Sequence, residues 1–90
     1  MKAKQVFYEG RVQGVGFRYT VKTIAQGFDV TGLVRNLTDG RVELQAMGDS
    51  GEISDFLQAV RESGLAGNIT AEHNHEIELP SRFKGFVIQS

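Results

Sequence analysis

A glycine-rich segment near the start of the chain has the residue types and spacing best suited to chemistry. Residues 10–18 read GRVQGVGFR, so three glycines precede the final Phe-Arg pair. A strand pattern enters this segment and a helix pattern leaves it. Glycine lets backbone N–H groups turn inward around a small ligand, and a helix N-terminus adds free N–H groups and a partial positive charge. We therefore predict an anion-binding loop, for which phosphate is the usual ligand.

Arg18 is an unusual residue for the first turn of a helix. A cation there faces the positive end of the helix dipole, which costs a few tenths of a kcal/mol or more. An anion bound between the two removes that conflict, and a guanidinium can hold two phosphate oxygens at once. A plain strand-to-helix turn with a surface arginine is the simpler alternative, but the glycines, the helix start and the misplaced charge together favour an anion site. The segment contains neither GxxxxGK[ST] nor GxGxxG, so it is not a nucleotide-binding loop of a known type.

The elements that must position this loop can be read from the hydrophobic periodicity. Strand patterns cover residues 4–12, 30–36, 42–47, 68–79 and 86–88. A helical stripe begins at Phe17 and ends near Gly27. A second helix is expected between Asp49 and Gly64, with Asp49 and Glu52 as a capping box. Thr38-Asp39-Gly40 is a turn signal between two strands and predicts a hairpin.

This order predicts an α+β, ferredoxin-like βαββαβ sandwich over a single domain, residues 1–90. Its antiparallel sheet carries two helices on one face, with a short extra C-terminal strand. The charged side chains of the sheet are expected to be solvated, at the surface or at its rim. They are Glu9, Arg11, Arg35, Arg41 and Glu43.

Composition limits the function classes. Ninety residues allow one small core, and the formal net charge of −1 argues against a broad nucleic-acid footprint. The chain has no cysteine, which excludes disulfides, thiolate catalysis and cysteine-based zinc sites. No apolar run approaches membrane-spanning length, and no signal-peptide pattern precedes the first strand. We expect a cytoplasmic protein with no membrane and no nucleic-acid partner.

Two motifs in order carry a resemblance to a known family. The first is G-x-V-Q-G-V-x-F-R, matched by residues 10–18, and the second is G-x-V-x-N-x-x-D-G, matched by residues 32–40. In both motifs the chain resembles the acylphosphatases, and the resemblance covers essentially its whole length. Thr38 is a minor departure, since many bacterial members have proline there.

The resemblance implies hydrolysis of acyl phosphates, which are mixed anhydrides of a carboxylic and a phosphoric acid. It places the catalytic residues at Arg18 and Asn36. It also implies that the phosphate group, or a similar anion such as sulfate, binds mainly to backbone N–H groups of one loop. Those groups belong to Gln13, Gly14, Val15, Gly16, Phe17 and Arg18.

The chemistry of these residues agrees with that assignment. An acyl phosphate has a good carboxylate leaving group, so the enzyme needs mainly to hold the phosphoryl group and stabilise its spreading charge. Asn36 offers a donor and an acceptor but is a poor base, so we expect it to orient the attacking water. By propensity alone, an asparagine beside a hairpin is a turn former. We expect no cofactor, no metal and a monomer.

Three alternatives remain open at this level. A non-catalytic anion-binding module would share the loop but would not need Asn36. An RNA-recognition module shares the topology and would need exposed aromatic residues, for which Phe7 is the candidate on the first strand. His73 and His75 share one face of a strand and could ligate a metal, but a third ligand would be needed. Polar residues at a sheet edge are the simpler explanation for the histidine pair.

Overall fold

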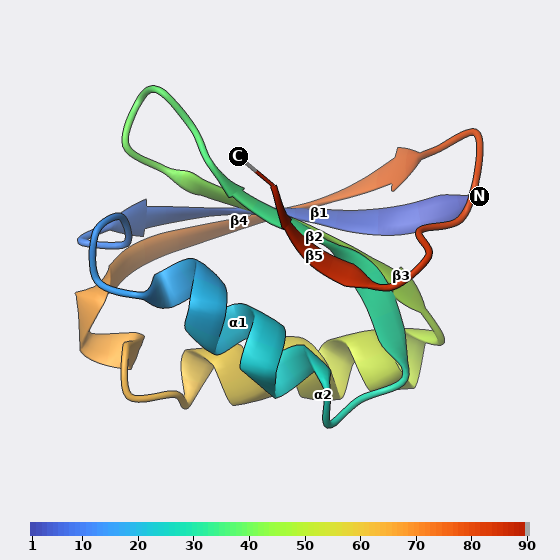
Figure 1. Ribbon diagram of the computed structural model, residues 1–90, viewed down its shortest axis with the longest axis horizontal. Coiled ribbons are helices and arrows are strands. Elements are labelled where there is room, and N and C mark those ends of the chain that lie inside the picture. The colour runs from blue at the N-terminus through green and yellow to red at the C-terminus, as the bar shows by residue number, and fades with distance from the viewer. Residues whose placement is uncertain (90) are drawn as a thin grey trace.

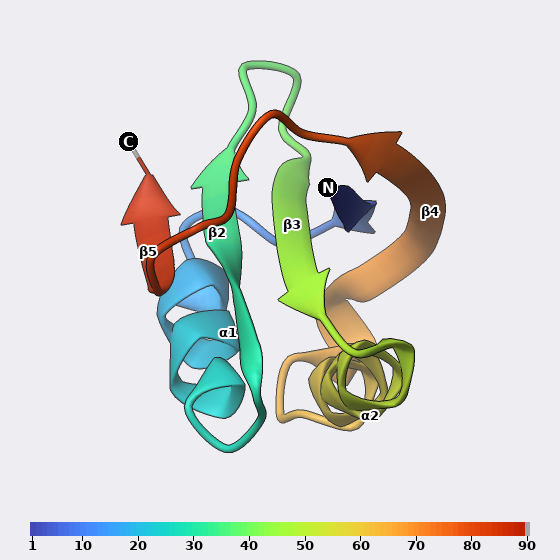
Figure 2. The ribbon, with the colours of Figure 1, turned by 90° about the vertical axis from the view of Figure 1, so that its right-hand side faces the viewer.

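One sheet with two helices on a single face makes up the fold (Figures 1 and 2). The computed structural model describes residues 1–89. The sheet has five strands in the order β4-β1-β3-β2-β5. In chain order the elements are β1 (Lys2–Gly10), α1 (Phe17–Ala25), β2 (Val30–Asn36), β3 (Val42–Gly48), α2 (Ser50–Arg61), a 3-10 turn (Ala66–Asn68), β4 (Ile69–Glu78) and β5 (Phe86–Gln89).

The topology is the predicted ferredoxin-like α+β plan. β1 and β2 flank α1 in the chain and lie on either side of β3, and both run antiparallel to it. β3 and β4 flank α2 and lie on either side of β1 in the same way. The extra strand β5 pairs parallel with β2 at the edge of the sheet. The first motif therefore follows the inner strand β1, where the chain leads into α1. The second motif lies at the end of the inner strand β2, where the chain leads into β3.

The core lies between the sheet and the helices. Val6 of β1 and Val34 of β2 both pair with Leu44 of β3, and all three side chains are fully buried on the helix face. The predicted stripes of both helices supply the other side: Phe17, Val21 and Ala25 of α1, and Ile53, Phe56, Leu57 and Val60 of α2, are buried. At about 25 cal/mol per Å² of apolar area, this burial is the main stabilising term of a small domain.

Tyr8 supports the start of α1 from the sheet. Its ring lies 5.1 Å, centroid to centroid, from the ring of Phe17, the first residue of the helix. The Tyr8 hydroxyl is buried and has no hydrogen-bond partner among residues 1–89. Burial, and then the negative charge of Glu72, raises the pKa of Tyr8, so the side chain stays neutral. The contact fixes the first turn of α1 against an inner strand.

Two local expectations are wrong. The first strand ends at Gly10 and not at residue 12, because its pairing with β4 shifts register there and the Arg11 N–H donates to the carbonyl oxygen of Asn68 at 2.8 Å. The capping box does not form either. Asp49 is the N-cap of α2 without a side-chain bond, and Glu52 accepts a hydrogen bond from the backbone N–H of Asp29 at 2.7 Å.

The expectation of solvated sheet charges is wrong for Glu43. This residue is only 2% exposed, on the sheet face opposite the helices. Its carboxylate accepts hydrogen bonds from Gln5 at 2.7 Å, Gln45 at 2.8 Å and Arg35 at 2.7 Å. Burial alone would raise the pKa of Glu43, but these donors and the charge of Arg35 lower it on balance. Three neighbouring donors therefore replace the water that the carboxylate loses.

Candidate active site

The loop between β1 and α1 has a backbone that requires glycine. Gly14 and Gly16 both have φ of 77°, in the left-handed region that other residues rarely adopt. A Cβ atom at either position would meet no heavy atom within 4 Å, so the requirement comes from conformation and not from space. Gly16 is also the N-cap of α1 and so offers no side-chain cap. The helix therefore begins without a side chain that hydrogen-bonds to its first backbone N–H groups.

The backbone N–H groups of residues 13–18 have no acceptor within residues 1–89. The first N–H of α1 to donate inside the helix is that of Thr20, which bonds to the carbonyl oxygen of Gly16 at 3.0 Å. The first turn contains no acidic side chain that would offset the helix dipole. A loop with unpaired donors at the positive end of a helix is suited to an anion.

Arg18 is the second residue of α1 and is half-buried. It forms no ion pair with any carboxylate among residues 1–89. Its guanidinium therefore remains available to a ligand at the helix start. A planar guanidinium can bind two oxygens of a phosphoryl group at once.

Asn36 is the last residue of β2 and pairs with Val42 across the hairpin. The residue is half-buried, and its Oδ1 atom is fully buried without a hydrogen-bond partner among the described residues. Buried side-chain oxygens are normally hydrogen-bonded. An unpartnered acceptor therefore marks a side chain that is suited to hold a small donor such as water.

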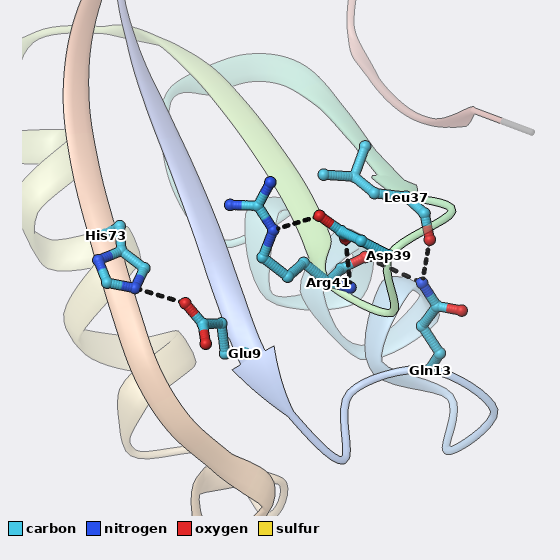
Figure 3. A network of polar contacts seen from close by, with 6 residues as sticks. All are labelled: Glu9, Gln13, Leu37, Asp39, Arg41 and His73. Carbon is cyan, nitrogen blue, oxygen red and sulfur yellow. Dashed lines mark hydrogen bonds and ion pairs between the residues drawn. The ribbon is translucent and has the colours of Figure 1, made fainter.

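Gln13 joins the loop to the hairpin that follows Asn36 (Figure 3). Its Nε2 atom donates to the carbonyl oxygen of Leu37 at 2.7 Å and to that of Arg41 at 2.9 Å. The two motifs, which are separate in the sequence, therefore lie side by side at one end of the sheet. The sequence predicts a role for the backbone N–H of Gln13 but gives no sign of the bonds made by its side chain, because the two partners are 24 and 28 residues away.

Asp39 and Arg41 stabilise the tip of the hairpin. Asp39 accepts hydrogen bonds from the backbone N–H of Arg41 at 3.0 Å and from its Nε at 2.8 Å. The backbone bond first, and then the side-chain bond, lowers the pKa of Asp39. The Arg41 guanidinium also lies 4.6 Å from the ring centre of Phe7, on the sheet face opposite the helices. Asp39 therefore stabilises the turn between β2 and β3.

The two histidines lie on the edge strand β4, away from the loop. His73 Nε2 lies 2.6 Å from a carboxylate oxygen of Glu9 (Figure 3). His75 packs edge-on against Phe7, with ring centres 5.8 Å apart. Within the part of the chain that the structure describes, no three His, Cys, Asp or Glu side chains are grouped so that they could hold a metal ion. In that same part, neither helix has the length and apolarity needed to cross a membrane.

Comparison with known proteins shows the family to which the chain is similar. The family model for acylphosphatase matches residues 4–88. The acylphosphatase of Staphylococcus aureus, strain Newman, is 43% identical over 83 residues, which cover 91% of this chain and 90% of that protein.

Solved structures are similar over the full chain. The crystal structure of acylphosphatase from Bacillus subtilis superposes with a TM-score of 0.87 at 34% identity, covering 100% of both chains. An acylphosphatase from Coxiella burnetii gives 0.84 at 30% identity, covering 98% of this chain and 92% of that one. The chain belongs to the acylphosphatase family.

Proposed function

We propose that this protein hydrolyses acyl phosphates to a carboxylate and inorganic phosphate at the loop of residues 13–18. In this proposal the backbone N–H groups bind the phosphoryl oxygens, Arg18 holds two of them, and Asn36 orients the attacking water. The observation that carries the proposal is the row of unpaired backbone N–H groups at the start of α1. The first turn of this helix has no acidic side chain, and its arginine, Arg18, forms no ion pair among the described residues. Membership of the acylphosphatase family supports the same reaction.

The reaction proposed is an in-line displacement at phosphorus. The water oxygen bonds to phosphorus, and the bond between phosphorus and the acyl oxygen breaks, so the carboxylate leaves with the electron pair. The proton of the water passes to a phosphoryl oxygen, because an amide such as that of Asn36 is too weak a base to take it. Arg18 and the N–H groups stabilise the charge that spreads over the phosphoryl oxygens.

We further propose that the enzyme needs no metal ion or cofactor and acts as a monomer on small acyl phosphates, without nucleic acid or membrane. A carboxylate is a good leaving group, so the charge stabilisation that a metal often supplies can come from Arg18 and the loop. The side chains proposed for catalysis, Arg18 and Asn36, both come from one chain.

The test is phosphate release from acetyl phosphate in excess chelator, with a phosphate monoester as the comparison substrate. We expect turnover of acetyl phosphate alone, competitive inhibition by inorganic phosphate, and no stimulation by divalent ions. Binding of phosphate without any turnover would instead indicate a non-catalytic anion-binding module. Activity that chelator abolishes and a divalent ion restores would contradict metal independence.

A further inference from the structure

The loop of residues 13–18, proposed above to bind phosphate, is called the phosphate loop below. The Gln13 side chain is the one hydrogen-bonded link between this loop and the hairpin among the described residues. Its amide nitrogen has two N–H groups, and both are used, at 2.7 Å and 2.9 Å. No other hydrogen bond joins residues 11–18 to residues 36–42 in the structure's described range. The relative position of the two segments at this edge therefore depends on one side chain.

The two acceptors are the residues that close the hairpin loop. The N–H of Leu37 donates to the carbonyl oxygen of Arg41 at 2.8 Å, and the N–H of Gly40 donates to the carbonyl oxygen of Leu37 at 3.2 Å. Gln13 thus binds both sides of the turn at once (Figure 3). Leu37 directly follows Asn36, so fixing its carbonyl fixes the end of β2 on which Asn36 stands.

We propose that Gln13 is a positioning residue, which holds Asn36 at the distance from the phosphate loop that places the water in line with phosphorus. The proposal rests on the roles given above to the loop and to Asn36. Gln13 acts through the hairpin and not on the anion. Its side chain should therefore matter for kcat and much less for phosphate affinity.

Gln13→Met tests this directly, because methionine keeps the length of the side chain and removes both donors. We expect kcat to fall about 10- to 100-fold, since misplacement of a reacting group by about 1 Å has effects of that size. The inhibition constant of inorganic phosphate should change less than about threefold, because the N–H groups of the loop remain. Gln26→Met is the matched control, since Gln26 is an exposed residue whose side chain makes no hydrogen bond in the described part of the chain. It should keep the parental kcat.

A second variant covers the case in which Gln13→Met does not fold, as judged by thermal unfolding. Gln13→Asn keeps the amide on a side chain one carbon shorter, which cannot span both carbonyl oxygens, so kcat should fall in the same way. A parental kcat in a folded variant, or a loss of phosphate affinity as large as the loss of kcat, would overturn the positioning role.

A double-mutant cycle with Asn36→Ala separates positioning from other effects. If Gln13 acts through Asn36, Gln13→Met should lower kcat by less than about threefold in the Asn36→Ala background. An equal loss in both backgrounds would refute the positioning role while leaving the proposed function intact. By contrast, a parental protein that binds inorganic phosphate but releases none from acetyl phosphate would refute the proposed function itself.

Discussion

At the residue scale, Asn36 is the position where an effect on turnover can be told apart from an effect on phosphate binding. Its buried Oδ1 atom has no partner among the described residues, which suits a water acceptor and not a phosphate ligand. We expect Asn36→Ala to lower kcat by about 10²–10³, as loss of a preorganised polar group does. Phosphate affinity should change by less than about tenfold. Steady-state kinetics with phosphate inhibition measures both quantities. Asn36→Asp should also lower kcat, because the negative charge of its carboxylate repels the phosphoryl group. A folded Ala variant with near-parental kcat would contradict the water-orienting role.

Arg18 should affect binding and turnover together. Charge-assisted hydrogen bonds contribute about 1.5–3 kcal/mol each, so loss of a two-oxygen contact in Arg18→Ala should lower kcat/KM at least about a hundredfold. Inhibition by inorganic phosphate should weaken in parallel. Arg18→Lys should rescue little, since an ammonium cannot copy the planar fork. Steady-state kinetics with phosphate inhibition measures both effects. A high kcat/KM in Arg18→Ala would mean that the backbone N–H groups of the loop bind the phosphoryl group without Arg18.

At the element scale, local patterns predicted the elements but not their long-range partners. The helical stripe of α1 and the turn at residues 38–40 were visible in the sequence, and the predicted order of elements along the chain, βαββαβ with an extra C-terminal strand, is confirmed. The anion-binding role of Arg18 was predicted from its place in the first turn of a helix, whereas the catalytic roles of Arg18 and Asn36 came from the motif resemblance and stay predictions. Besides the burial of Glu43, three features could not be predicted: the end of β1, the bond from Asp29 to Glu52, and the Gln13 link. Each depends on a partner more than twenty residues away, which no local pattern records.

The glycines of the loop lead to a prediction about the helix start. Gly16→Ala places a Cβ on a residue with φ of 77°, which costs about 1 kcal/mol or more and is relieved by turning the loop's N–H groups away from the anion. We expect a lower Tm and weaker phosphate inhibition. Gly51→Ala is the matched control, because Gly51 lies within α2, its φ is not positive, and a Cβ there meets nothing within 4 Å. It should raise stability by about 0.5–1 kcal/mol. Equal behaviour of the two variants in thermal unfolding would contradict the conformational argument.

At the scale of the whole molecule, the helices cover one face of the sheet (Figure 2). A network of polar side chains stabilises the other face. Glu43 of β3 accepts from Gln5 of β1 and from Arg35 of β2, and Arg35 also donates to Gln89 of β5 at 3.1 Å. The network therefore joins four of the five strands. Because Arg35 directly precedes Asn36, the same network stabilises the strand that carries the proposed catalytic amide.

Glu43 should make the stability of the fold depend on pH in acid. Its folded pKa lies below the ordinary 4.5, so its stabilising effect is complete above that pH and is lost as the pH falls through the folded value. Glu43→Gln keeps the size but removes the charge-assisted bonds, and should lower the free energy of unfolding at neutral pH by about 1–3 kcal/mol. Urea unfolding of both proteins across a pH series measures the difference, which should shrink as the pH falls from 4.5 through the lower folded pKa, where the parental carboxylate takes up its proton. A difference that grows in acid would mean that burial dominates over the three donors and that the pKa of Glu43 is raised.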